Sequence, residues 1–265
     1  MDYRIKGRVA LVVGGSKGMG FEAAKMLADE GCPIGILART AADVEAAAAA
    51  IRHRGGTAIS VPADITSQEG VATAVERVRE ELGDPLIVIG QTKYLRSGDF
   101  SDITDPAPLR ESFESYTISQ FYLLHAVLPA MKEAGWGRYV HIGSATAKEP
   151  TGSIHHMVAN ATRPSTIGLL KTVADEYARY GITVNTVAPG WIETENSLNY
   201  LADSVGVTTD DQRREFLLSQ ARIPAGRMGK AAEIASLIVY LCSDAAGYIT
   251  GDWIEVDGGL HRSAF

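Results

Sequence analysis

Cysteine, long apolar runs and an excess of positive charge are all scarce in this chain. Its 265 residues include 2 cysteines, Cys32 and Cys242, which are far apart and form neither a metal-binding spacing nor a disulfide framework. We therefore expect buried thiols and no metal site. The first apolar run, residues 9–13, is too short for a signal peptide or a membrane span. These absences predict a cytoplasmic protein that does not bind membranes.

The charge balance is acidic. The chain has 25 Lys and Arg against 32 Asp and Glu, a formal net charge of −7, and its basic residues form no dense run. Nucleic-acid binding needs clustered basic charge, so a small-molecule substrate is expected instead. With 46% hydrophobic residues the chain can bury one large core, which predicts a single domain over residues 1–265.

Short apolar segments of strand composition alternate with helical segments. The strands are expected at residues 9–13, 34–37, 58–61, 86–89, 139–142, 183–187 and 253–256. The helices are expected at residues 21–30, 41–54, 67–82, 108–133, 165–180 and 231–242. This alternation predicts a sheet covered by helices on both faces. The fold class is therefore α/β, a single doubly wound Rossmann-type domain with a seven-stranded, mainly parallel sheet.

One long stretch interrupts the alternation. Residues 195–221 are polar and contain no segment of strand composition. Loops of this kind often close over an active site, so we expect a substrate lid there. No linker or internal repeat divides the rest of the chain.

A glycine-rich turn joins the first strand to the first helix. Its members are Gly14, Ser16, Lys17, Gly18, Met19 and Gly20. Glycines there allow the backbone to approach a pyrophosphate, while the helix N-terminus offers free N–H groups and a partial positive charge. The strand-to-helix context predicts dinucleotide binding, whereas the alternative is a plain tight turn.

The end of the second strand indicates which dinucleotide is bound. An NAD-selective site would carry an acidic residue here for the ribose 2′-hydroxyl, but Arg39 follows Leu37 and Ala38. Arg39 and Lys17 suit a 2′-phosphate, which favours NADP(H) over NAD(H). The alternative is that both are solvated surface cations.

The glycine spacing resembles that of the short-chain dehydrogenase/reductase family, as do segments across nearly the whole chain, at residues 64–65, 137–144, 185–194, 248–251 and 256–259. The resemblance implies adenine contacts by Asp64 and Ile65. It also implies a catalytic Ser144 at the end of the fifth strand, with Pro189 and Gly190 beside the nicotinamide. The backbone of Ile192 and the hydroxyl of Thr194 would then bind the carboxamide. The carboxy-terminal segments imply a homotetramer or a homodimer.

The chain departs from the family at the catalytic Tyr-x-x-x-Lys pair. Alignment on residues 167–171 places Ala159 at the tyrosine position and Arg163 at the lysine position, whereas counting from Ser144 without a gap gives Met157 and Ala161. Arg163 can hold ribose hydroxyls or stabilise an anion, but it cannot shuttle a proton. Otherwise it is a cation on a helix surface. Ser144 can hydrogen-bond a substrate oxygen or merely cap a turn.

Two other residues are candidates for the missing proton donor. Tyr116 stands where the family has an asparagine, although a tyrosine in an apolar helix is often core or interface. His156 follows His155 on the expected pocket wall and titrates near neutrality, although adjacent histidines are often polar surface. Lys148 can position an acidic substrate, or it is simply solvated.

The segment Asn160-Ala161-Thr162-Arg163 is typical of a divergent branch of the family that has Asn-x-x-Arg in place of the usual pair. We predict an atypical NADP(H)-dependent oxidoreductase that interconverts a small carbonyl and an alcohol. The alternatives are a non-redox enzyme of lyase, isomerase or dehalogenase type, or a catalytically lapsed NADPH-binding protein. The intact glycine turn argues against the dehalogenase, which replaces that turn by an anion pocket.

Overall fold

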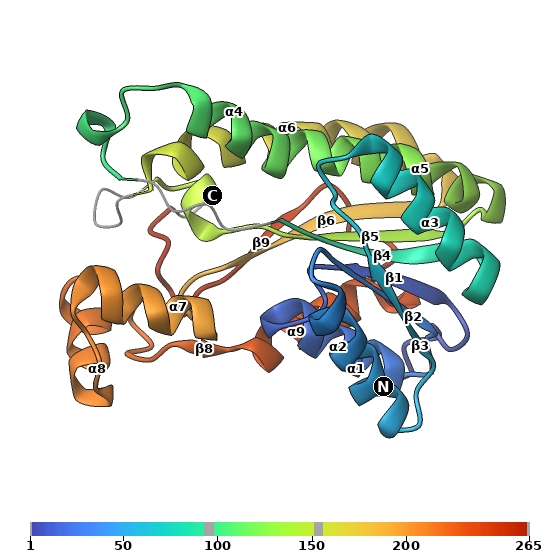
Figure 1. The fold of residues 1–265 in the computed structure, drawn as a ribbon, viewed down its shortest axis with the longest axis horizontal. Helices are drawn as coiled ribbons and strands as arrows, with labels where there is room; N and C mark the ends of the chain where they lie inside the picture. The colour runs from blue at the N-terminus through green and yellow to red at the C-terminus, as the bar shows by residue number, and fades with distance from the viewer. Residues whose placement is uncertain (1, 93–97, 151–155, 264–265) are drawn as a thin grey trace.

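The computed structural model describes residues 2–92, 98–150 and 156–263. Its main sheet has seven parallel strands in the order β3-β2-β1-β4-β5-β6-β9 (Figure 1). Their bounds are β1 Val9–Val13, β2 Ile34–Ala38, β3 Ala58–Pro62, β4 Pro85–Gln91, β5 Gly137–Ile142, β6 Ile182–Pro189 and β9 Trp253–Val256. The expected strands are thus confirmed to within two residues at each end.

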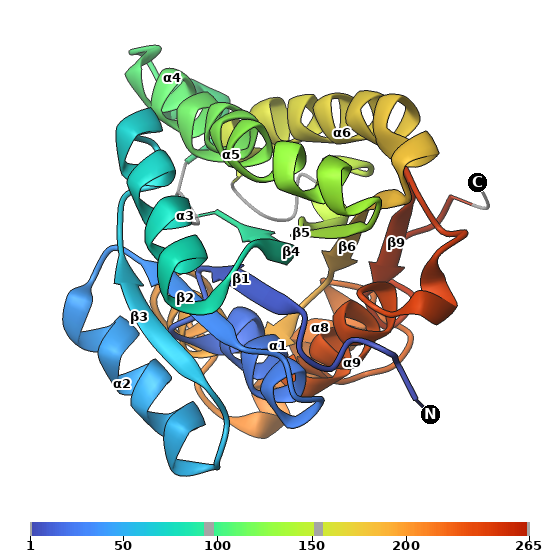
Figure 2. The same cartoon turned by 90° about the vertical axis from the view of Figure 1, so that its right-hand side faces the viewer.

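Helices cover both faces of this sheet, as Figures 1 and 2 show. One face carries α1 Gly18–Asp29, α2 Ala41–His53 and α9 Ala231–Leu241. The other carries α3 Gln68–Leu82, α4 Ala107–Phe113, α5 Ser119–Ala134 and α6 Met157–Tyr177. Each face encloses its own apolar cluster, which is why the strands read as nearly continuous apolar runs.

The strand order reverses between β1 and β4. The chain passes from β1 through β2 to β3 on one side and from β4 through β5 to β6 on the other. In open α/β sheets the crevice outside the carboxyl ends of the strands at such a reversal is the binding site. The fold therefore places any ligand at the ends of β1, β4 and β5.

Both cysteines lie in the apolar interior and are free thiols, as expected. Cys32 donates a hydrogen bond to the Ile5 carbonyl at 3.3 Å. Burial raises the pKa of Cys32 to about 12 and also raises that of Cys242. Neither thiol is therefore a nucleophile near neutral pH.

The helix expected at residues 165–180 begins eight residues earlier, at Met157, and runs through Pro164. The prediction was wrong because proline usually begins or breaks a helix. Packing overrides that preference: Val158, Ala159 and Thr162 are all buried. Arg163 consequently lies on the helix, where its side chain has a defined direction.

The helix expected at residues 108–133 is also different. It consists of α4 and α5 joined by a π-helical turn, Glu114–Ile118. Such turns place one extra residue in a helix and often occur at functional sites. The sequence of the turn contains no glycine or proline that would mark an interruption of the helix.

Residues 195–221 fold over the cleft end of the sheet. They contain α7 Glu195–Tyr200, a π-helical turn Leu201–Val205 and α8 Asp210–Ser219. A separate apolar cluster holds them together, centred on Leu201, Phe216 and Leu217. A small sheet of β7 Ile192–Glu193 and β8 Gly229–Lys230 joins this unit to the domain.

Within residues 2–92, 98–150 and 156–263, none of the helices is both long and apolar enough for a membrane crossing. No group of three or more His, Cys, Asp or Glu side chains in those ranges is arranged to hold a metal ion.

Candidate functional site

A cleft of about 1400 Å³ opens at the carboxyl edge of the sheet. It runs from the glycine turn and the end of β2, past β4 and β5, to α6 and α7. Nearly every residue predicted for a site lies in its wall: Gly14, Ser16, Lys17, Gly18, Met19, Arg39, Asp64, Ile65, Tyr116, Ser144, His156, Arg163, Pro189, Gly190, Ile192 and Thr194. The structure therefore brings the predicted nucleotide and catalytic residues into one continuous cavity.

The glycine turn has no room for larger residues. A Cβ atom on Gly20 would lie 2.7 Å from the Gly14 carbonyl oxygen and 2.8 Å from Gln91 Oε1. Gly14 itself has a φ of +66° and is covered by the Gln91 side chain. The turn is thus a backbone cradle of the kind that a pyrophosphate requires.

The first helix begins at Gly18, whereas the composition predicts a start near Phe21. The low helix propensity of glycine favours the later start. Close packing of Gly20 against Gly14 and Gln91 overrides that propensity. The helix N-terminus, with its free N–H groups, therefore lies inside the turn.

The adenosine end of the cleft carries two cations. Lys17 and Arg39 both line it, and Lys17 Nζ lies 3.2 Å from Asp43 Oδ2. On the other side, Asp64 Oδ1 accepts hydrogen bonds from the backbone and the hydroxyl of Thr66, at 3.0 and 2.8 Å. These bonds orient the carboxylate at the end of β3.

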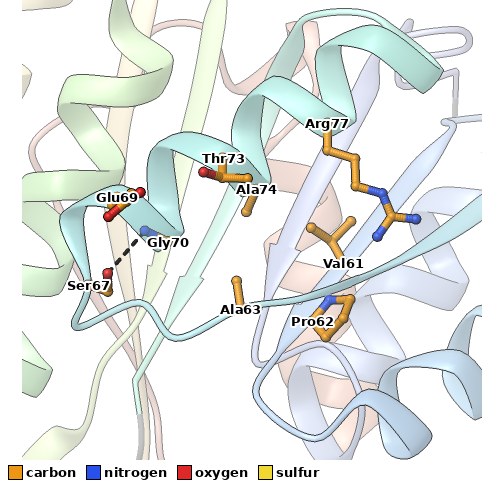
Figure 3. A pocket seen from close by; sticks show the side chains of 9 residues that line it. All are labelled: Val61, Pro62, Ala63, Ser67, Glu69, Gly70, Thr73, Ala74 and Arg77. Carbon is orange, nitrogen blue, oxygen red and sulfur yellow. Dashed lines mark hydrogen bonds between the residues drawn. The ribbon is translucent and has the colours of Figure 1, made fainter.

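A second cavity of about 440 Å³ adjoins this end, between β3 and α3 (Figure 3). Ala63 lines both cavities. The single basic side chain in its lining, Arg77, donates to Glu81 Oε1 at 2.7 Å, and the Gly70 backbone N–H donates to Ser67 Oγ. The described lining therefore offers no second phosphate site.

Arg163 is the centre of the opposite end of the cleft. Its Nη1 donates to Thr146 Oγ1 at 2.7 Å and to Ser144 Oγ at 3.2 Å. Its Nη2 donates to the Tyr116 hydroxyl at 3.3 Å, and its Cζ lies 5.3 Å from the centre of the tyrosine ring. Three hydroxyl groups from two separate segments thus surround one guanidinium.

The hydrogen bonds restrict where the hydroxyl protons can point. Ser144 Oγ and Thr146 Oγ1 are 3.1 Å apart, so one of the two donates to the other. Each hydroxyl accepts from Arg163, which has no lone pair to take a proton. The Tyr116 proton and one of the Ser144 and Thr146 protons therefore remain to be donated within the cleft.

A seam of hydroxyl groups holds Tyr116 and Arg163 in register. Ser112 is hydrogen-bonded to Thr162 at 2.6 Å, and Thr117 is hydrogen-bonded to Thr166 at 3.1 Å. Thr166 Oγ1 also donates to the Tyr116 carbonyl at 2.8 Å. The seam ties the π-helical turn to α6, which fixes the distance between the side chains of Tyr116 and Arg163.

His156 lies immediately before α6 and is 9% exposed. Its ring packs edge-on against Tyr200 of α7, with the ring centres 5.4 Å apart. The prediction that it lines the pocket is confirmed. Its neighbour His155 lies outside the described residues.

The segment predicted to contact the nicotinamide follows β6. Ile192 is buried in β7, and Thr194 caps α7 by accepting a hydrogen bond from the Ser197 backbone at 3.3 Å. Gly190 packs closely against Asp257, where a Cβ atom would meet the backbone. The segment therefore forms a firm wall of the cleft.

Sequence reasoning missed Thr146, Gln91 and His141, which also line the cleft. His141 on β5 is 4% exposed. Burial lowers its pKa to about 4, with the charge of Arg163 adding to the effect, so its ring is neutral. The sequence does carry a signal for Thr146, because Thr146 lies two residues beyond Ser144 and both follow the end of β5.

Comparisons with known proteins agree with this arrangement. The model of the family described as Enoyl-(Acyl carrier protein) reductase matches residues 13–261. The 3-oxoacyl-(acyl-carrier-protein) reductase of Pseudomonas aeruginosa is 34% identical over 263 residues, which cover 98% of this chain and 99% of that relative. The corresponding enzyme of Escherichia coli is 33% identical over 256 residues, covering 97% and 98%.

Two solved structures are similar throughout. L-sorbose reductase from Gluconobacter frateurii, complexed with NADPH and L-sorbose, has a TM-score of 0.91 at 28% identity and covers 99% of this chain and 100% of its own. An NADPH-bound short chain oxidoreductase from Pseudomonas aeruginosa, described as containing an atypical catalytic center, has a TM-score of 0.89 at 28% identity, covering 97% and 98%.

Proposed function

Since the chain belongs to the short-chain dehydrogenase/reductase family, we propose that it is an NADP(H)-dependent oxidoreductase that interconverts a small carbonyl compound and an alcohol. The observation that carries the proposal is the set of hydroxyls around Arg163, at the far end of the same cleft as the glycine cradle. A charged donor array and a dinucleotide cradle in one cavity suit hydride transfer to a carbonyl.

The cradle fits the cofactor on physical grounds. Gly14 and Gly20 leave a space that a Cβ atom would fill, and Lys17 and Arg39 supply positive charge near the end of β2. In the proposal these residues hold the pyrophosphate and the 2′-phosphate, while Asp64 and Ile65 contact the adenine. When bound, NADPH supplies the hydride that a carbonyl carbon accepts.

The protein's own task is to stabilise and protonate the resulting alkoxide. Ser144 donates a hydrogen bond to the substrate oxygen. Arg163, which donates to Ser144, stabilises the negative charge on that oxygen through its own positive charge. Tyr116 is the preferred acid because its hydroxyl accepts a hydrogen bond from the guanidinium, so the O–H can be directed at the substrate oxygen. Arg163 itself only donates hydrogen bonds, since a guanidinium has no lone pair to take up a proton.

His156 is the second candidate for the acid. It lines the cleft, and a protonated imidazole can donate a proton. Its packing against Tyr200 gives it another role as a contact between α7 and the start of α6. We therefore rank it below Tyr116.

In this proposal the chain is a member of a divergent branch with Asn-x-x-Arg in place of Tyr-x-x-x-Lys. Ala159, aligned with the usual tyrosine, is fully buried and carries no acidic group. The change is coordinated, because Arg163 contacts Tyr116 at the second altered position. The described atypical center of one structural relative is consistent with such a branch.

The proposal extends to the organisation of the chain. We take residues 1–265 as one domain and residues 195–221 as its substrate lid, since α7 contributes Glu195, Asn199 and Tyr200 to the cleft wall. We also propose a homotetramer or homodimer, because Phe113 and Phe121 are 42% and 43% exposed on neighbouring helices. Light scattering of the purified protein tests the assembly.

Equilibrium titration with NADPH and, separately, NADH tests the proposed function without knowledge of the substrate. Nicotinamide fluorescence or calorimetry provides the signal. Tight NADPH binding with much weaker NADH binding supports the proposal and justifies a screen of carbonyl compounds and alcohols. Binding of neither cofactor contradicts it. Binding of NADPH with no turnover in a broad screen supports instead a lapsed enzyme that retains only the nucleotide site.

A further inference from the structure

We propose that Asp43 is an internal counter-charge of the nucleotide site, which the 2′-phosphate of NADPH displaces from Lys17. Asp43 thereby limits how strongly the protein prefers NADPH to NADH. The inference rests on the proposed use of NADP(H), and it concerns a residue that neither lines the cleft nor belongs to the glycine turn.

One ion pair links the glycine turn to α2. Lys17 lies in the glycine turn, immediately before α1, and Asp43 lies in the first turn of α2. Their Nζ and Oδ2 atoms are 3.2 Å apart. Lys17 lines the cleft, so the pair stands at its rim.

The position of the 2′-phosphate follows from the fold. The adenine ribose of a dinucleotide lies at the end of the second strand, where Arg39 comes directly after Ala38, the last residue of β2. α2 begins two residues later, at Ala41, and its N-terminus favours a negative charge. A phosphate beside Arg39 is therefore attracted both to Lys17 and to this helix end.

In the free protein, Asp43 already interacts with both Lys17 and the N-terminus of α2. Its carboxylate pairs with Lys17 and lies in the helix turn where negative charge is stabilised. In the free protein the carboxylate thus pairs with the same Lys17 charge that the 2′-phosphate pairs with in the complex. Since a phosphate monoester carries more than one negative charge near neutral pH, the two groups repel each other when Lys17 turns toward the cofactor.

The pair is weak enough to exchange. The side chain of Lys17 is 64% exposed and that of Asp43 is 37% exposed, so water and salt screen their attraction. Lys17 can leave Asp43 without unfolding any element. Breaking the ion pair therefore weakens the binding of NADPH but not that of NADH, which has no 2′-phosphate.

The test is a titration of the full-length protein and its Asp43→Asn variant with NADPH and with NADH. We expect the variant to bind NADPH about 3- to 10-fold more tightly and NADH with less than about a twofold change. Glu45→Gln is the matched control: it removes the same charge from the same helix, but Glu45 pairs with Arg52. The control should leave both dissociation constants unchanged.

Two further measurements separate the mechanism from a general charge effect. The gain from Asp43→Asn should shrink as ionic strength rises, because the groups are exposed. It should also shrink in a Lys17→Met background, in which the carboxylate has no partner to withhold and only its repulsion of the phosphate remains.

An unchanged or weaker affinity for NADPH in the Asp43→Asn variant would overturn the inference, as would an equal gain for NADH. In either case the proposed function still stands if the wild-type protein binds NADPH. If the wild-type protein binds neither cofactor, both the proposed function and this inference are wrong.

Discussion

Nη2 of Arg163 lies 3.3 Å from the Tyr116 hydroxyl, although 47 positions separate the two residues in the chain. The contact joins α6 to the π-helical turn before α5. A guanidinium in this place polarises the phenol while leaving its proton to be donated.

Replacement of Arg163 should remove the charge that stabilises the alkoxide. We expect Arg163→Ala to lower kcat about 100- to 1000-fold, the range found when one donor to an oxyanion is lost. Arg163→Lys should recover only part of the loss, because lysine lacks the planar fork that reaches Thr146 and Tyr116 together. Steady-state kinetics with a substrate from the screen provides the measurement. Arg179→Ala, beyond the end of α6, is the control.

The proton donor is identified by removing single functional groups. Tyr116→Phe keeps the buried ring and deletes the hydroxyl, and should reduce kcat by about 100-fold or more with little effect on NADPH affinity. His156→Gln should have a much smaller effect on kcat. The reverse order of effects would make His156 the acid, and full turnover in both variants would eliminate both candidates.

Thr166 should position Tyr116 through the carbonyl that it binds. We expect Thr166→Val to lower kcat about 10-fold without weakening NADPH binding, because the lost bond releases the π-helical turn. Thr166→Ser should restore activity. Thr172→Val removes a comparable hydroxyl that bonds Gly168 on the outer side of the same helix, and should change nothing. A uniform loss of thermal stability in place of the kcat effect would contradict the positioning role.

The glycine cradle can be tested without any substrate. Gly20→Ala forces a Cβ atom against the Gly14 carbonyl and Gln91, so we expect NADPH affinity to fall at least about 10-fold. Gly168→Ala in α6 meets no atom within 4 Å and should bind NADPH normally. It should also stabilise the helix by about 0.5 to 1 kcal/mol. Equal NADPH affinity in both variants would mean that the turn does not contact the cofactor.

The carboxy-terminal segment should respond to pH through Asp257 and His261, whose Oδ2 and Nδ1 atoms are 2.9 Å apart. The hydrogen bond to Asp257 raises the pKa of His261. Burial raises the pKa of Asp257, but the hydrogen bonds from His261 and Gly259 outweigh it and lower the pKa below its ordinary value. Both groups are therefore charged in mildly acidic solution.

These two pKa shifts set the pH range in which each group stabilises the folded protein. The contribution of His261 is complete below its unfolded pKa of about 6.5 and is lost as pH rises through the raised folded value. That of Asp257 is present above about pH 4 and is lost as pH falls through the lowered folded value. His261→Gln should thus lower Tm most between about pH 4 and 6.5, and progressively less as pH rises through the raised pKa of His261. A Tm difference that stays constant over this range would contradict the ion pair.

The amino-acid sequence by itself determined the strands, the parallel sheet and the nucleotide end of the cleft. The reason is that these features depend on local patterns. Apolar runs such as Val9–Val13 specify buried strands, and Gly14 and Gly20 mark a turn that only glycine can form. The parallel order then brings the ends of β1, β4 and β5 to one edge, so the sequence predicts Ser144 at that edge.

Only the tertiary structure decided the end of the cleft around Arg163. Arg163 precedes a proline, a local signal for a helix boundary, yet packing extends α6 back to Met157. Tyr116 faces Arg163 because a π-helical turn is held against α6 by hydroxyl pairs such as Ser112 with Thr162, which lie 50 residues apart in the chain. Contacts between residues so distant in the chain leave no periodic trace in the sequence, and their geometry exists only once the helices have packed.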